Sequence, residues 1–328
     1  MKRFTTLWTL TAAVLLSMMA AFPAQASKEQ SNERFGVYVG GGCEGVKRLK
    51  AFGEWFGREP DYALEFISWE VLSKGTTWGV RCWSQGGKKN VVFSLPMLPK
   101  DKTATLADGA AGKFDDYYRR YAEHLVKHGF GRTVLRIGWE FNADWYPWRA
   151  QDDPQAWIAY WRRIVTTMRS VPGAEFKFDW NAAGGWTSFD PELAYPGDEY
   201  VDIIGLDFYN SLKEDVSPEE RWAIRKKAPR GLDWHKRFAT ARSKPMSYAE
   251  WGTGIRKDGR GGDDDPYFIE QMAAWIHSNN VAYHNYWDYK APDFDARLSD
   301  NRRPRAGNAL KVAFASTGTK PTKETASP

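Results

Sequence analysis

Short apolar runs recur along the chain, and most of them are separated by stretches with the periodicity of amphipathic helices. Eight runs contain few charged residues and lie at 35–39, 63–67, 91–95, 134–137, 176–178, 203–206, 246–249 and 282–286. Near-continuous apolar strands with helices between them are typical of a parallel sheet covered on both faces. Eight such strands in one chain predict the α/β class and, within it, a single (β/α)8 TIM barrel.

The stretches between these runs repeat apolar residues every three or four positions, which predicts helices with one buried face. The clearest are 115–128, 154–169, where Pro154 occupies the favoured first turn, and 265–278. The stretch 219–242 is helical in pattern but is interrupted by Pro-Arg-Gly at 229–231. Strand and helix therefore alternate along most of the chain, as the barrel requires.

The beginning of the chain has a different pattern. Lys2 and Arg3 precede an apolar stretch at 10–21, and Ala24-Gln-Ala26 is a cleavage site of small residues. This is the pattern of a secretion signal over residues 1–26, so we predict cleavage near Ala26 and a secreted or periplasmic protein. A retained membrane anchor is the alternative interpretation.

Composition divides the remaining chain into three parts. Residues 27–33 are expected to form a flexible lead-in, and residues 34–315 the barrel domain. From Ser316 the chain is polar and contains proline, so residues 316–328 are predicted to form a disordered tail. We expect the mature protein to be a monomer that has no membrane partner.

Charge and cysteine content narrow the possible partners. The 328-residue chain has 46 Lys and Arg against 41 Asp and Glu, and their interspersed arrangement does not indicate a nucleic-acid partner. Cys43 and Cys82 both lie in the predicted exported part, where they could form a disulfide or remain two buried thiols. No Cys or His pattern has the spacing of a metal site, so we expect neither a metal nor an organic cofactor.

Two of the predicted strands run directly into carboxylates. Glu140 and then Asn142 follow the run 134–137, and Glu250 follows the run 246–249. Barrel enzymes build their active sites at the carboxyl ends of the strands. Two carboxylates on either side of a glycosidic bond are the minimal machinery for its hydrolysis. The alternative for each glutamate is a surface or helix-capping carboxylate.

Arg136 shares strand parity with Glu140, so both side chains point the same way if the strand is regular. A guanidinium beneath two carboxylates favours their ionised form, and a nucleophilic carboxylate must be ionised. The aromatic content, with 17 Trp, 18 Phe and 15 Tyr, supplies flat rings that could stack on sugars. Core packing is the alternative for each ring.

Four motifs in combination resemble glycoside hydrolase family 26. They are Arg-x-x-x-Glu-x-Asn-x-x-Trp-x-x-Trp at 136–148, Tyr-Pro-Gly-Asp-Glu-Tyr-Val-Asp at 195–202, Gly-Leu-Asp-Phe-Tyr at 205–209 and Ala-Glu-Trp-Gly at 249–252. That family contains secreted β-mannanases, with some relatives that cleave β-glucan or β-xylan. The likeness covers residues 35–314. It implies a retaining barrel enzyme in which Glu140 is the acid/base and Glu250 is the nucleophile.

The resemblance and the strand ends together suggest further contacts with substrate. The family's counterpart of Tyr209 bonds the nucleophile, and Trp287 follows the eighth strand, where a ring could form the floor beneath the sugar at the cleavage point. The other candidates are amides for hydroxyl groups and indoles for stacking: Asn142, Trp145, Trp148, Trp180, Asn181 and Trp186.

Trp139 is a departure from the family pattern, which usually has His immediately before the acid/base. An indole cannot accept a hydrogen bond as imidazole can. We therefore expect weak action on plain β-1,4-mannan and a preference for a different or decorated β-glycan, with Trp139 among the substrate-contacting residues.

The sequence thus predicts an exported, retaining endo-β-glycosidase that hydrolyses internal β-linkages of a polysaccharide by double displacement. The substrate could be β-mannan or a bacterial exopolysaccharide. Two other functions remain open, a non-catalytic carbohydrate-binding barrel and a polysaccharide lyase. The presence of both glutamates favours the hydrolase.

Overall fold

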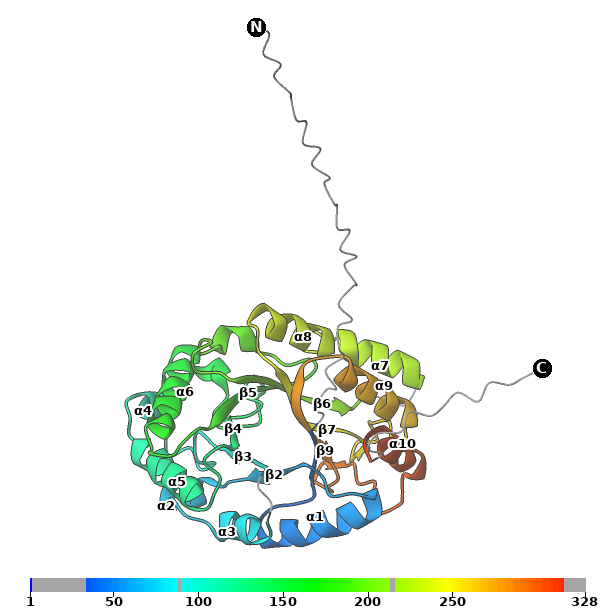
Figure 1. The fold of residues 1–328 in the computed structure, drawn as a ribbon, viewed down its shortest axis with the longest axis horizontal. Coiled ribbons are helices and arrows are strands. Elements are labelled where there is room, and N and C mark those ends of the chain that lie inside the picture. The colour runs from blue at the N-terminus through cyan, green and yellow to red at the C-terminus, as the bar shows by residue number, and fades with distance from the viewer. Residues whose placement is uncertain (2–33, 88–89, 213–215, 316–328) are drawn as a thin grey trace, which may run out of the picture. The chain divides into compact units, whose positions relative to one another are not determined.

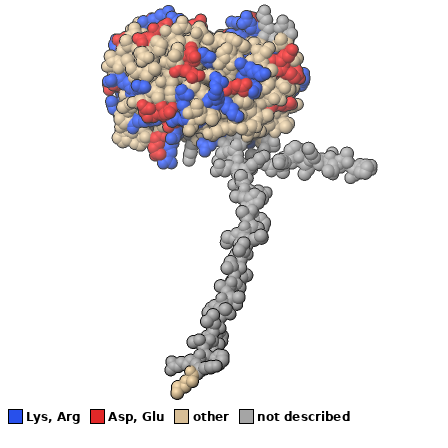
Figure 2. Space-filling model, turned by 90° about the horizontal axis from the view of Figure 1, so that it is seen from above, with Lys and Arg blue, Asp and Glu red and all other residues tan. Residues whose placement is uncertain are grey.

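The computed structural model describes residues 1, 34–87, 90–212 and 216–315. The predicted signal, lead-in and tail lie outside the described residues. Within these ranges no helix is long and apolar enough to cross a membrane. On the face presented in Figure 2, Lys and Arg are interspersed with Asp and Glu.

Eight parallel strands close into a barrel, with each strand paired to the next and the last to the first (Figure 1). The strands are β1 (Phe35–Tyr38), β2 (Tyr62–Phe66), β3 (Val91–Leu95), β4 (Val134–Ile137), β5 (Lys177–Ala183), β6 (Ile203–Asn210), β7 (Met246–Thr253) and β9 (Val281–Trp287). The predicted fold is confirmed, and every predicted apolar run overlaps one of these strands, although the runs 35–39, 63–67 and 176–178 each extend one residue beyond the strand. Strands β5, β6 and β7 continue well beyond their apolar runs into polar residues at the carboxyl ends.

Helices surround the barrel (Figure 1). They are α1 (Gly42–Phe56), α2 (Trp69–Lys74), α3 (Trp78–Gln85), α4 (Leu106–Ala110), α5 (Asp115–Lys127), α6 (Pro154–Arg169), α7 (Pro218–Lys227), α8 (Leu232–Ala241), α9 (Pro266–His277) and α10 (Pro304–Phe314). Single-turn helices η1 (Ala150–Asp152) and η2 (Pro191–Ala194) and a small sheet of β8 (Ile255–Arg256) and β10 (Phe294–Asp295) complete the described elements.

The predicted helices are confirmed, and their ends follow from capping. The side chain of Asp153 accepts a hydrogen bond from the amide of Ala156, immediately before Pro154 begins α6. Ser217 and Glu220 form a reciprocal capping box at the start of α7. The interrupted stretch is two helices, α7 and α8, separated at the predicted Pro-Arg-Gly.

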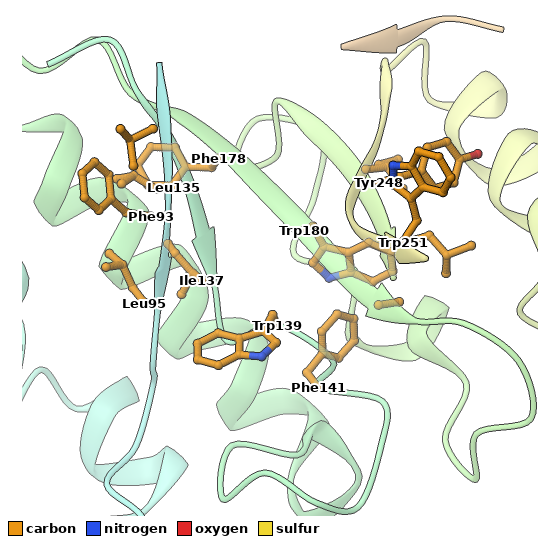
Figure 3. Packing of buried hydrophobic residues seen from close by; sticks show 14 of the residues in the cluster. Phe93, Leu95, Leu135, Ile137, Trp139, Phe141, Phe178, Trp180, Tyr248 and Trp251 are labelled. Carbon is orange, nitrogen blue, oxygen red and sulfur yellow. The ribbon is translucent and has the colours of Figure 1, made fainter. Parts of the chain in front are cut away.

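Strand alternation divides the interior into two cores. On β3, Val92 belongs to a small cluster inside the barrel, whereas Phe93 and Leu95 belong to a large cluster that includes helix residues. Figure 3 shows side chains of this outer layer on β3, β4 and β5. Because side chains alternate between the two faces of a strand, inward positions near the carboxyl ends are available to polar groups.

Cys43 of α1 and Cys82 of α3 form a disulfide, with their Cα atoms 5.0 Å apart. The structure thus decides between the two alternatives for these residues. The bond joins the helix after β1 to a helix after β2, and 39 positions separate the two cysteines. In the chain-entropy model, a loop of this length contributes about 4 kcal/mol to stability.

Candidate active site

Glu140 is placed by an irregular turn at the end of β4. Gly138 has φ +50° and Glu140 has φ +55°, a left-handed conformation that a residue with a side chain rarely adopts. The positive φ favours glycine at position 138, and a Cβ atom there would lie 2.4 Å from the Met97 sulfur, so Met97 would have to shift. The amide of Glu140 donates to the carbonyl of Asn181 at 2.9 Å, which anchors the turn on β5. Strain of this kind is concentrated at functional sites.

Glu250 is placed by a bulge in β7. Between Ser247 and Trp251 the strand has one residue more than its neighbour β6 has between Gly205 and Phe208. The register against β9 also shifts, between Tyr248 and Trp251. A bulge re-aims the side chain next to it. Glu250 shares parity with the outward Tyr248, but the extra residue turns its carboxylate towards Arg136 and the barrel mouth.

Arg136 connects the two strand ends. Its side chain is completely buried and donates to the Glu250 carboxylate at 2.7 Å and to the Ser94 hydroxyl at 3.2 Å. It also bonds Asp207 and the amide oxygen of Asn181. Burial alone would lower the pKa of Arg136, but the carboxylates of Asp207 and Glu250 raise it. The guanidinium lies beside the Glu250 carboxylate and interacts electrostatically with Glu140, as the strand parity predicted.

Both oxygens of the Glu250 carboxylate have a fixed donor. Arg136 donates to Oε1, and the hydroxyl of Tyr209 donates to Oε2, each at 2.7 Å. Burial and the nearby negative charge of Glu250 raise the pKa of Tyr209 well above its usual value, so the phenol remains a neutral donor. These two donors fix the direction of the carboxylate and would stabilise negative charge on it, as an attacking group requires.

Glu140 has the opposite electrostatic setting. Burial, and next the negative charge of Glu250, raise its pKa to about 7, against the opposing effect of Arg136. The indole of Trp145 donates to its Oε2 at 2.8 Å. A carboxyl group with a pKa near 7 can hold a proton at neutral pH, which is what a general acid requires.

Two cavities meet at this pair. A cavity of about 590 Å³ contains Glu140, Tyr209 and Arg225 in its lining, and a second of about 460 Å³ is lined by aromatic rings such as Trp139. Glu250, Tyr146 and Trp287 line both. We call the first the charged half of the cleft and the second the aromatic half.

The aromatic half is built from rings that support one another. Trp139 is 6% exposed, and its Nε1 donates to the hydroxyl of Tyr146 at 2.8 Å. Trp148 stacks on Tyr146 with ring centres 4.5 Å apart, and its Nε1 donates to the carbonyl of Trp139. Trp287 stacks on Tyr38 at 4.3 Å where the two halves meet. Trp139, Trp148 and Trp287 therefore form walls of the cleft.

The structure corrects the expectation for Trp180. Its ring is 0% exposed and packs against Phe141 and Phe238, with centroids 4.9 and 5.3 Å away (Figure 3 shows Phe141). Trp180 cannot contact a sugar in this arrangement, because it faces the outer layer of the barrel. Its neighbour Asn181 has the opposite parity and faces inward, where it bonds Arg136. Asn181 is also completely buried, so it positions Arg136 and does not reach a hydroxyl of the substrate.

Asn142 is corrected in a similar way. Its amide is 1% exposed, and it donates to the carbonyl of Ala183 and to the Thr187 hydroxyl. Its oxygen accepts from the amide of Ala183 at 2.7 Å. With these bonds formed, the side chain fastens the loop after β4 to the end of β5. Trp145 and Trp186 remain open to solvent, each 58% exposed.

Asp207 and Arg225 are site residues that the sequence reasoning missed. Asp207 lies inward on β6, two positions before Tyr209, and bonds Arg136. Strand parity with Tyr209 could have indicated it. Arg225 comes from α7 and gave no signal in the sequence. Within the described ranges, no group of three or more His, Cys, Asp or Glu side chains is arranged to hold a metal ion.

Comparison with known proteins identifies relatives of part of the chain. The family model described as glycosyl hydrolase family 26 matches residues 127–225. Endoglucanase H of Acetivibrio thermocellus is 31% identical over 172 residues, which are 49% of this chain and 18% of that protein. A mannan endo-1,4-β-mannosidase of Bifidobacterium adolescentis is 28% identical over 171 residues, 47% of this chain and 16% of that protein. The chain thus spans less than a fifth of the length of either curated relative.

Solved structures share the fold. An endo-β-1,4-mannanase from Cellulomonas fimi has a TM-score of 0.57 at 18% identity, covering 82% of this chain and 69% of that one. GH26C from Muricauda sp. has a TM-score of 0.63 at 16% identity, covering 88% and 86%. At these identities the likeness establishes the barrel alone.

Proposed function

We propose that this chain, of which residues 127–225 match the model of glycosyl hydrolase family 26, hydrolyses internal β-glycosidic linkages of a polysaccharide with retention of configuration. The observation that carries this proposal is the contrast between the two glutamates. Glu140 has a pKa raised to about 7, while Glu250 is held by a guanidinium and a phenol. One carboxyl can donate a proton while the other attacks.

The proposed reaction has two displacements. Glu140 protonates the oxygen of the leaving sugar while Glu250 attacks the anomeric carbon, which forms a covalent glycosyl-enzyme. Glu140, now ionised, then takes a proton from water as the water attacks the same carbon, and Glu250 is released. As Glu250 loses negative charge in the first step, the raised pKa of Glu140 falls, which suits its change from acid to base.

The proposed range of substrates is wider than β-mannan, which is the commonest substrate of the family. The two curated relatives are named for glucan and for mannan cleavage, so a β-linked backbone is the shared feature. Trp139 places an indole where the family usually has His, and the ring is held between Tyr146 and Trp148. We propose that the preferred polymer is a bacterial exopolysaccharide or a decorated β-glycan, with plain β-1,4-mannan a poor substrate.

One experiment tests the reaction class. Purified protein is incubated with β-mannan, β-glucan and a panel of bacterial exopolysaccharides. Release of reducing ends, with early product of retained configuration by proton NMR, is the expected result. Unsaturated products that absorb in the ultraviolet would indicate a lyase. Binding of a polymer without any cleavage would favour a carbohydrate-binding barrel instead.

Export is proposed on independent grounds. The Cys43–Cys82 disulfide is of the kind that persists in oxidising compartments, and the first 26 residues have the composition of a secretion signal. We propose that the mature protein acts in the periplasm or outside the cell. Sequencing the amino terminus of protein recovered from those fractions tests this, and an intact Met1 there would contradict cleavage near Ala26.

A further inference from the structure

Arg225 is a buried cation in the lining of the charged half of the cleft. Its side chain, on α7, is only 5% exposed, and it lines the same cavity as Glu140 and Glu250. Its Nε has no hydrogen-bond partner. Its Nη2 reaches the carbonyl of Gly184 at 3.5 Å, the limit of a hydrogen bond. Among the described residues, no carboxylate lies within ion-pair distance of this guanidinium.

The other buried arginines show that this is unusual within the molecule. Arg136 is paired with Asp207 and Glu250, Arg221 has Asp265 at 3.5 Å, and Arg303 has Asp263 at 2.7 Å. A buried charge without a partner is costly, so proteins normally supply one. In agreement, burial lowers the pKa of Arg225 to about 10, and no neighbouring acid offsets that effect.

The surroundings of Arg225 hold the guanidinium but leave space beside it. It lies 5.4 Å from the centre of the Phe208 ring and 5.9 Å from that of Trp186. A Cβ at Gly185 would lie only 2.5 Å from Nη1, whereas a Cβ at Gly184 would meet the carbonyl of Asp207. Gly184 lines the cavity with Arg225. Glycine at position 185 therefore leaves space beside this cation that a side chain there would fill.

We propose that Arg225 binds the carboxylate of an acidic sugar residue in the polysaccharide, beside the linkage that is cleaved. A guanidinium presents a planar fork of donors that matches a carboxylate. Trp186, 58% exposed and next to Arg225, offers a ring face for the same sugar. This inference rests on the proposed glycosidase function and specifies its substrate as an acidic β-glycan.

The other charged residues in the described lining of this cavity have a partner or keep a proton, with Asp207 and Glu250 sharing the single guanidinium of Arg136. Arg256 pairs with Asp293 at 3.2 Å, so it has a partner that Arg225 lacks. Asp207 is bonded to Arg136, and Glu140 holds its proton up to about pH 7. Among the described residues that line this half of the cleft, Arg225 is therefore the cation without a carboxylate partner.

The test uses matched probes: β-1,4-linked glucose and mannose oligosaccharides, each plain and with C6 oxidised to a carboxylate. Their dissociation constants are measured by calorimetry on the full-length protein carrying Glu140→Gln, so that no turnover is needed. We expect the oxidised form to bind at least about tenfold more tightly, the usual effect of a hydrogen bond to a charged group. Equal affinities in this protein, where Arg225 is intact, would overturn the proposal.

Variants then locate the effect. Adding Arg225→Met should abolish the preference, and Arg225→Lys, which keeps the charge without the fork, should retain part of it. The control is Arg256→Met, in the same cavity, which should keep the preference because that cation is already paired. A preference that survives Arg225→Met would overturn the assignment to Arg225.

The melting temperature separates a binding role from a packing role. Arg225→Met removes an unpaired buried charge and should melt at or above the wild-type temperature. If no glycan is hydrolysed but the preference is observed, only the proposed catalysis fails. If plain and oxidised glycans are both hydrolysed but bind equally, only this inference fails.

Discussion

The two halves of the cleft are built on different principles. In the aromatic half, Trp139, Tyr146 and Trp148 satisfy one another's polar atoms and pack ring against ring. In the charged half, Arg225 is buried and no carboxylate among the described residues pairs with it. A wall whose polar atoms are already hydrogen-bonded to one another selects a ligand by shape and contact. A buried ion without a partner selects a ligand of opposite charge. Under the proposed function, the aromatic half would recognise the sugar backbone and the charged half an acidic substituent, and Glu250 and Trp287 lie where the halves meet.

The largest effect, on the reaction rate, is expected from replacing either of the two glutamates. Glu140→Gln and Glu250→Gln should each lower the rate at least roughly 10²–10⁴-fold, the contribution of general acid catalysis alone, because the two residues act in different steps. Binding of oligosaccharides should persist in both variants. Rates on the preferred polymer provide the measurement, with Glu70→Gln, on the rim of the aromatic half, as the matched control. Near-normal turnover in either variant would remove that residue from the mechanism.

Replacing Arg136, which lies beneath the cleft, is expected to give the next largest effect, and the quantity that changes is the free energy of unfolding. Arg136→Met would leave Asp207 and Glu250 buried without their cation, which should cost about 3–5 kcal/mol of unfolding free energy. Chemical denaturation measures this loss. The double variant Arg136→Met/Asp207→Asn should recover part of it, because one of the two stranded charges is gone. Equal stability of the single and double variants would contradict the pairing.

A smaller effect is expected on the aromatic half. Trp139→His restores the polar side chain usual in the family, so kcat/KM on plain β-1,4-mannan relative to a decorated glycan should rise by roughly threefold to tenfold, the effect of one added hydrogen bond. Trp139→Phe keeps an apolar ring and should leave the ratio low. If the wild-type protein has a higher kcat/KM on plain mannan than on the decorated glycan, Trp139 does not determine the choice of substrate.

The smallest effect concerns the pH profile. Glu140 must be protonated to act as the acid, and its protonated fraction falls as pH rises through about 7, so kcat/KM should decline above that pH. The indole of Trp145 bonds the ionised form at 2.8 Å and lowers the pKa. In Trp145→Phe the pKa should rise, and the alkaline limb should move to higher pH. Trp186→Phe, equally exposed but not bonded to Glu140, should leave the limb unchanged.

Much of the fold is predictable from local pattern. The apolar runs place all eight barrel strands, and Pro154 marks the start of α6 correctly. Arg136 and Glu140 are assigned to one side of the barrel by parity, and the structure places both at its mouth. Parity also separates Trp180 from Asn181, so the expectation that both contact substrate overlooks a signal present in the sequence.

The sequence by itself determined the strands, the helices and the two glutamates at the strand ends, because burial patterns and capping act between residues that are close along the chain. Only the tertiary structure decided the direction of Glu250, because the bulge in β7 exists only against the registers of β6 and β9. It alone also revealed Arg225, since the absence of a partner can be seen only when all neighbours are in place. Pairing between distant residues is a property of the folded barrel, and no local pattern encodes it.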